Sequence, residues 1–143
     1  MKSGKSAALR AVIDTNAIVS ALLFPLRRTA ALLSLARTGR YRLLTSPALL
    51  REQARILRHR FSWTDEAIRT HLKDLAHIGE IITPTEVPAI LERDPDDDEV
   101  LACAVAGKAD LIVTGDRDLL HLKSHHDIGI VRPVDFLRTL GVE

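Results

Sequence analysis

The sequence of 143 residues has one cysteine, few aromatic residues and no long hydrophobic run. A single cysteine excludes an internal disulfide bond, and Cys103 lies among apolar residues, so we interpret it as a small core residue rather than a nucleophile. Aromatic residues make up 3% of the chain, which argues against a protein that only binds single-stranded nucleic acid by stacking on its bases. No apolar stretch is long enough to cross a membrane and the N-terminus does not resemble a signal peptide, so we expect a cytoplasmic protein.

The size and composition are those of an ordinary globular protein. An apolar content of 46% is enough for a buried core, and we expect residues 1–143 to form a single domain. The net charge is +1, yet residues 1–60 hold 12 of the 20 basic residues and two of the 19 acidic ones. Residues 61–143 hold the other 8 basic and 17 acidic residues. This asymmetry suggests one surface for a polyanion and another for metal, although helices with solvated arginine faces explain it equally well.

Short apolar runs alternate with helical patterns along the chain. Strands are expected over residues 9–13, 42–45, 80–83, 109–114 and 128–131. Helices are expected over residues 17–23, 29–36, 47–60, 64–77, 96–107 and 133–140, with a further helix beginning near residue 117. A loop is expected after the strand over residues 80–83, up to residue 92. The alternation predicts an α/β fold with a parallel sheet covered by helices on both faces.

Carboxylates follow two of the predicted strands directly. Asp14 follows the strand over residues 9–13, and Asp116 and Asp118 follow the strand over residues 109–114. Ligands bind at the carboxyl ends of the strands in such sheets, and a site of several carboxylates suggests a hard divalent cation. Asp14 and Asp116 also have structural alternatives. Asp14 or Asn16 could cap the next helix, and Asp116 could cap the helix near residue 117.

Glu52 lies at the edge of an apolar helix stripe. Leu49 precedes it by three residues and Ile56 follows it by four, so its carboxylate is expected to be partly desolvated. An acid in such a place needs a cation. Arg55 or His59 on the same helix could supply that charge, and this alternative is as well supported as a bound metal.

Residues 94–98 hold four aspartates, which cannot all cap one helix. We expect Asp96 to be the N-cap, with Glu99 completing a capping box. Asp97 and Asp98 precede Leu101 by four and three residues, so either can point inward with the core face. Clustered like charges repel one another, and a bound cation would relieve that repulsion.

Four motifs resemble those of one known family when they occur in this order. They are VIDTN at 12–16, SPALLREQARIL at 46–57, RDPDDDEVLACA at 93–104 and VTGDRDLL at 113–120. The chain resembles PIN-domain proteins, and more closely the VapC-like ribonuclease toxins of bacterial and archaeal toxin–antitoxin pairs. The resemblance extends from about Ala11 to Leu140. It implies a three-layer α/β/α PIN-like fold with a central parallel sheet and an acidic site for Mg²⁺ or Mn²⁺.

The resemblance also implies roles for individual residues. The family's catalytic acids correspond to Asp14, Glu52, Asp97 or Asp98, and Asp116. The metal ligands among them are Asp14, Asp97 or Asp98, and Asp116, while Asn16 and Thr114 match polar positions that support the site. Separately, the basic residues Arg27, Arg28, Arg40 and Arg42 are candidates for holding an RNA backbone.

The implied function is a divalent-metal-dependent endoribonuclease, the toxin of a type II pair, with an RNA substrate, an antitoxin partner and a homodimeric state. Bound metal would orient water, lower its pKa and stabilise the leaving oxygen. The alternative is a non-catalytic PIN-like module that binds RNA or protein. A phosphatase of the haloacid-dehalogenase type is disfavoured, because it needs a second aspartate two residues after Asp14, where Asn16 stands.

Overall fold

The computed structural model describes residues 8–85 and 95–142, with the side chains of the second part described from residue 97 onward. The strands are β1 (Arg10–Ile13), β2 (Arg42–Thr45), β3 (Glu80–Ile81), β4 (Leu111–Val113), β5 (Ser124–His125) and β6 (Ile128–Val131). The α-helices are α1 (Thr15–Leu23), α2 (Ala31–Arg37), α3 (Pro47–Phe61), α4 (Asp65–Ile78), α5 (Pro95–Ala106), α6 (Arg117–Leu122) and α7 (Pro133–Thr139). A short 3₁₀ helix, Arg28–Ala30, precedes α2.

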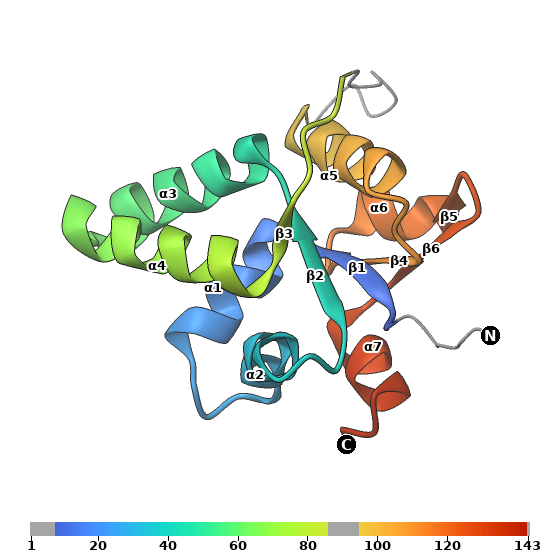
Figure 1. Cartoon of the computed structure of the whole chain (residues 1–143), viewed down its shortest axis with the longest axis horizontal. Coiled ribbons are helices and arrows are strands. Elements are labelled where there is room, and N and C mark those ends of the chain that lie inside the picture. The colour runs from blue at the N-terminus through green and yellow to red at the C-terminus, as the bar shows by residue number, and fades with distance from the viewer. Residues whose placement is uncertain (1–7, 86–94, 143) are drawn as a thin grey trace.

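The six strands form one sheet in the order β3-β2-β1-β4-β6-β5. Every neighbouring pair is parallel except β5 and β6, which are antiparallel. β1 lies between β2 and β4, with Ala11 opposite Leu43 on one side and Leu111 on the other. α5 and α6 cover one face of the sheet, and α1, α2 and α7 cover the other (Figure 1). The predicted three-layer α/β/α fold with a central parallel sheet is confirmed.

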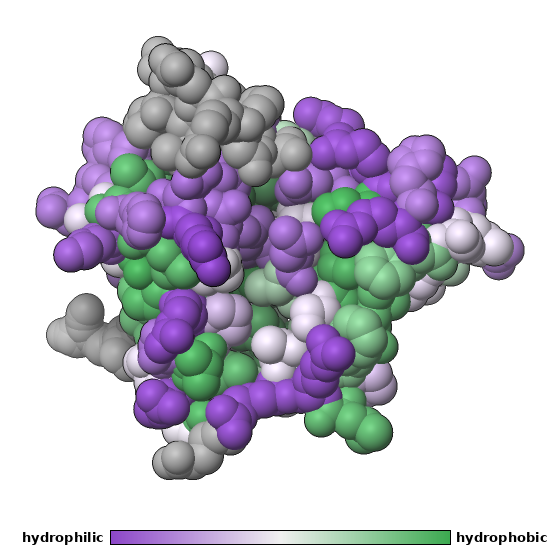
Figure 2. Space-filling model, turned by 180° about the vertical axis from the view of Figure 1, so that it is seen from behind, coloured by the Kyte–Doolittle hydropathy of each residue, from purple (hydrophilic) through white to green (hydrophobic). Residues whose placement is uncertain are grey.

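The surface of the described residues carries a few large exposed hydrophobic side chains. They are Phe24, Leu26, Phe61, Ile81 and Val105. Seen from behind, hydrophobic residues form separate patches between groups of hydrophilic residues (Figure 2). Within the described ranges no single helix is long and apolar enough to cross a membrane. Taken together, α1 and the segment Arg28–Arg37 have the length and composition of a membrane span, but the chain bends by 105° between them.

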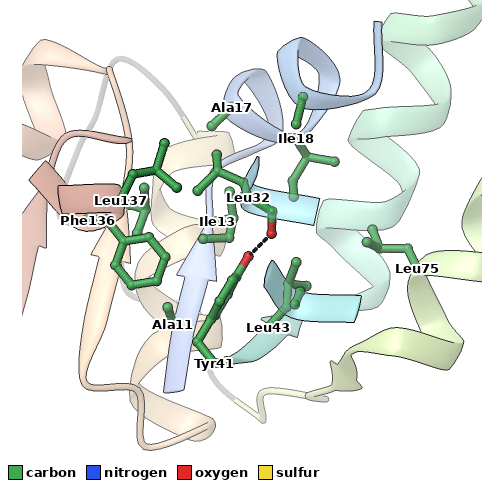
Figure 3. Close-up of a cluster of buried hydrophobic side chains, with 13 residues drawn as sticks. Ala11, Ile13, Ala17, Ile18, Leu32, Tyr41, Leu43, Leu75, Phe136 and Leu137 are labelled. Carbon is green, nitrogen blue, oxygen red and sulfur yellow. Dashed lines mark hydrogen bonds between the residues drawn. The ribbon is translucent and has the colours of Figure 1, made fainter. Parts of the chain in front are cut away.

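The core on the α1, α2 and α7 side is built around a buried tyrosine. Ala11 and Ile13 of β1 point to this side, because alternate residues of a strand face opposite sides of the sheet. The Tyr41 hydroxyl donates a hydrogen bond to the carbonyl oxygen of Leu32 at 2.6 Å (Figure 3). The Tyr41 ring meets the Phe136 ring edge-on, with centroids 4.9 Å apart. The buried hydroxyl therefore has a partner, and α2 and α7 are joined through one side chain.

The core on the α5 and α6 side contains Val12 of β1 together with Leu101 and Cys103 of α5. Cys103 is fully buried, and burial raises the pKa of its thiol to about 12. A thiol with this pKa stays protonated near neutral pH, and thiols react as nucleophiles in the thiolate form. The interpretation of Cys103 as a core residue is confirmed.

Several predicted boundaries differ from the structure. α1 begins at Thr15 rather than at residue 17, because Asp14 is its N-cap and accepts a hydrogen bond from the Thr15 N–H. α5 begins at Pro95, so Asp96 lies inside the helix and is not its N-cap. Proline at a first helical position has the φ angle that the helix needs. The strand predicted over residues 80–83 ends at residue 81. Residues 86–92 of the expected loop, and Asp94, lie outside the described residues.

The β5–β6 hairpin was not predicted. β5 has only two residues, and its turn places His126 and Asp127 at φ angles of 51° and 64°. Two consecutive residues with positive φ are typical of the tight turns that connect antiparallel strands. The hairpin gives the otherwise parallel sheet one antiparallel edge.

Candidate metal centre

Three aspartates from two helices converge beyond the carboxyl end of β4. Asp97 lies in the first turn of α5, Asp116 is the N-cap of α6, and Asp118 lies in the first turn of α6. One carboxylate oxygen of each lies within 4.8 Å of the other two. Asp97 is buried and the other two are half-buried. A donor set made only of carboxylate oxygens fits Mg²⁺ or Mn²⁺, and we call these residues the three-acid cluster.

Asp116 also caps a helix. Its Oδ1 accepts hydrogen bonds from the backbone N–H of Asp118 at 2.8 Å and of Leu119 at 3.1 Å. Asp116 therefore caps α6, as its structural alternative predicted. Capping is compatible with metal binding, because both hydrogen bonds use the same carboxylate oxygen. The cap fixes the orientation of the carboxylate, so that Oδ2 can serve an ion.

Asp14 is joined to Asp116 through a buried threonine. The Thr114 hydroxyl donates to Asp14 Oδ2 at 2.6 Å and accepts the Asp116 N–H at 3.0 Å. Asp14 Oδ1 also accepts the Thr15 N–H at 2.7 Å. These contacts follow from the sheet, because β1 and β4 are neighbours and Ile13 lies opposite Val113. Asp14 is buried and borders the three-acid cluster without belonging to it.

Glu52 reaches the same edge of the sheet from α3. The Thr15 hydroxyl donates to Glu52 Oε1 at 2.5 Å, and the Glu52 side chain is half-buried, as its place on the helix predicted. Thr15 was not singled out from the sequence, although it stands between two residues that were. Asn16 is exposed, and its side chain makes no hydrogen bond to another described residue.

Asp97 and Asp98 are both buried, with exposures of 4% and 6%. Successive residues of an α-helix point about 100° apart, so the two carboxylates leave α5 in different directions. Asp97 belongs to the three-acid cluster and Asp98 does not. The geometry therefore favours Asp97 as the ligand, a choice that the sequence left open. Asp118, which the sequence did not single out as a ligand, is the third member of the cluster, and metal binding by Asp14 stays a prediction.

Two of the candidate RNA-binding arginines lie at the edge of the sheet formed by the amino ends of the strands, opposite the acids. Arg42 opens β2 beside Arg10 of β1, and its Nε lies 3.4 Å from Glu80 Oε1. The Arg40 guanidinium donates to the carbonyl oxygen of Leu140 at 2.7 Å. This edge holds the amino ends of β1 and β2, whereas the acids follow the carboxyl ends. The structure does not bring Arg40 or Arg42 to the three-acid cluster.

Arg27 and Arg28 lie beyond the far end of α1. Nine residues of α1 separate them from Asp14, a length of about 13 Å along the helix axis. The Arg27 guanidinium stacks on Phe24, 3.9 Å from the ring centroid. Both arginines line a surface cavity of about 670 Å³ that contains none of the acids. RNA binding by these residues stays a prediction.

A profile of the PIN domain matches residues 10–118, more than half of the chain. The chain belongs to the PIN-domain family. The matched range contains Asp14, Glu52 and the three-acid cluster. A relative in Methanocaldococcus jannaschii, the uncharacterized protein MJ1680, is 30% identical over 127 residues, which cover 82% of this chain and 77% of the relative.

Two crystal structures share the fold of this PIN domain. PAE2754 from Pyrobaculum aerophilum has a TM-score of 0.62 and 19% identity, with 98% of this chain and 95% of that chain covered. VapBC2 from Rickettsia felis, bound to a DNA fragment from their promoter, has a TM-score of 0.59 and 19% identity. That match covers 87% of this chain and 98% of the other. At these identities the likeness is one of fold.

Proposed function

We propose that this PIN-domain protein is a divalent-metal-dependent endoribonuclease, which hydrolyses RNA phosphodiester bonds in the cytoplasm with Mg²⁺ or Mn²⁺. The observation that carries the proposal is the three-acid cluster at the carboxyl edge of the sheet. Negative charges held this close repel one another, and a bound cation would relieve that repulsion. Membership of the PIN-domain family supports the same reading of the site.

The proposed chemistry needs no protein nucleophile, because water would attack the phosphodiester. Asp97, Asp116 and Asp118 would hold the ion. A divalent ion there supplies Lewis acidity and lowers the pKa of water. Asp14, held by Thr114 and Thr15, presents a fixed carboxylate beside the cluster and can orient the attacking water. The buried thiol of Cys103 takes no part.

The proposal is tested by the activity of the wild-type protein. Labelled RNA should be cleaved in Mn²⁺ or Mg²⁺, cleavage should stop in EDTA, and it should return when excess metal is added. Cleavage that survives EDTA would contradict a metal-dependent mechanism. RNA that is bound but never cut with either metal would favour the non-catalytic PIN-like module instead.

We also propose that the protein is the toxin of a type II toxin–antitoxin pair. Its fold likeness to VapBC2 supports this proposal. An antitoxin-like reading frame beside the gene, whose product forms a complex with this protein and inhibits its cleavage of RNA, is the expected finding. Full activity in the presence of such a neighbour's product would contradict it.

Metal binding is expected to stabilise the fold. A ligand that binds only the folded state at 100 times its dissociation constant adds about 2.7 kcal/mol. For a chain of this size this raises Tm by roughly 5–10 °C, at 2–4 °C per kcal/mol. The measurement is thermal unfolding with and without millimolar Mn²⁺, and Asp116→Asn is the control expected to show a much smaller shift. An unchanged Tm in the wild type would count against the cluster as a metal site.

A homodimer is the state we expect in solution, and the helices around residues 30–35 and 49–57 are candidates for its interface. Leu32, Leu49 and Leu57 of these helices are fully buried in the core, so an interface there would use their partly exposed neighbours. The exposed Phe24 and Leu26 are the alternative. Sedimentation velocity over a range of concentrations checks the dimer, and a monomer throughout would remove it from the account.

A further inference from the structure

Thr15 contacts two carboxylates that come from different elements of the fold. It is the first residue of α1 and is 1% exposed. Its backbone N–H donates to Asp14 Oδ1 at 2.7 Å, and its hydroxyl donates to Glu52 Oε1 at 2.5 Å. Asp14 directly follows β1, and Glu52 lies on α3, 37 residues after Thr15. One buried residue therefore bonds both acids.

The same contacts extend to the three-acid cluster. Asp14 is bonded to the Thr114 hydroxyl, which accepts the N–H of Asp116. Glu52, Thr15, Asp14, Thr114 and Asp116 thus form one hydrogen-bonded chain across α3, α1, β1 and β4. In this chain Thr15 is the link between Glu52 and the rest. A glutamate side chain has several rotatable bonds, so a hydroxyl that holds its carboxylate removes freedom that would otherwise misplace it.

We infer that Thr15 is a positioning residue of the metal centre, whose hydroxyl holds the Glu52 carboxylate at the site. The inference rests on the proposed function. The backbone N–H of Thr15 cannot hold Glu52 instead, because it already donates to Asp14. Loss of an outer hydrogen bond that holds an acid of a metal site typically costs 10–100-fold in metal affinity or activity, and an effect of that size is expected here.

The chain offers a matched control in Thr45, the last residue of β2. Thr45 is 2% exposed, and its hydroxyl has no hydrogen-bond partner among the described residues. Thr15→Val and Thr45→Val therefore make the same change of shape and chemistry in two buried positions. Only the first removes a hydrogen bond to a carboxylate. Thr15→Ser keeps the hydroxyl and removes the methyl group, so it separates hydrogen bonding from packing.

The experiment compares wild type, Thr15→Val, Thr15→Ser and Thr45→Val. Mn²⁺ affinity is measured by calorimetry, and kcat and KM are measured with labelled RNA. Thr15→Val should lower Mn²⁺ affinity, kcat or both by about 10–100-fold, with little change in KM. Thr15→Ser should restore most of the loss, and Thr45→Val should match wild type. A folded Thr15→Val protein is established by its circular dichroism and Tm.

Two results would overturn the inference. In the first, Thr15→Val equals wild type in both Mn²⁺ affinity and kcat. In the second, Thr15→Ser is as impaired as Thr15→Val, which would assign the effect to the methyl group. Failure of the proposed function is seen separately, in the wild type alone. If wild type binds Mn²⁺ without cutting RNA, the affinity comparison still decides the role of Thr15; if it does not bind Mn²⁺, the inference falls with the function.

Discussion

Asp116→Asn should reduce RNA cleavage by about 10³-fold or more, since metal contributes several kcal/mol to transition-state stabilisation and each 1.4 kcal/mol is tenfold. Asparagine keeps the shape of aspartate and caps a helix nearly as well, so α6 should still begin at Arg117. The variant loses one negative charge from the three-acid cluster and with it metal affinity. RNA binding should persist or improve, because a repelling carboxylate is gone. Asp14→Asn should have the same consequence.

The control for this prediction is Asp127→Asn. Asp127 is exposed in the β5–β6 turn at φ 64°, a backbone conformation that asparagine also adopts readily. Asp127→Asn removes one negative charge at an exposed turn outside the cluster, so this variant should cleave RNA like wild type. The same assay compares Asp97→Asn with Asp98→Asn, of which the first should be the more impaired. Wild-type activity in Asp116→Asn would refute the proposed mechanism.

Phe136→Ala should lower the free energy of unfolding by about 3–5 kcal/mol. Phe136 is 1% exposed and packs edge-on against Tyr41, so its removal leaves a cavity between α7 and α2 (Figure 3). This is a large part of the 5–15 kcal/mol that typically separates folded and unfolded states. Urea denaturation followed by circular dichroism measures the change. Because α7 and the acids of α5 and α6 lie on opposite faces of the sheet, molecules that remain folded should cleave RNA normally.

Phe61→Ala is the matched control for the core prediction. Phe61 is 40% exposed at the end of α3, and alanine is a better helix former than phenylalanine. Its removal should change the free energy of unfolding by no more than about 0.5 kcal/mol. Equal losses in Phe136→Ala and Phe61→Ala would contradict the assignment of this core.

The parallel sheet could be predicted because its strands are buried on both faces. Val12 and Ile13 pack on opposite sides of the sheet, so β1 is apolar at successive positions and stands out in the sequence. The β5–β6 hairpin could not be predicted, because Ser124 and His125 are polar and their turn contains no glycine. The start of α5 was misplaced by its run of aspartates, each of which is an acceptable cap.

The acids of the site were predictable where they follow strands, since the sheet brings such positions together. Asp14 and Asp116 are of this kind. Asp97 could not be separated from Asp98, because that choice depends on the rotation of α5 about its axis. The link from Thr15 to Glu52 joins residues 37 positions apart, and only the packing of α1 on α3 creates it. The place of Asp118 in the cluster depends on the turn that Asp116 caps.

The position of a bound manganese ion would show whether the three-acid cluster is a metal site. Crystals grown or soaked with Mn²⁺, and measured for the anomalous scattering of manganese, would locate the ion without reference to activity. We expect an anomalous peak within coordination distance of the carboxylates of Asp97, Asp116 and Asp118. Crystals saturated with Mn²⁺ that show no peak at these three residues would contradict this expectation.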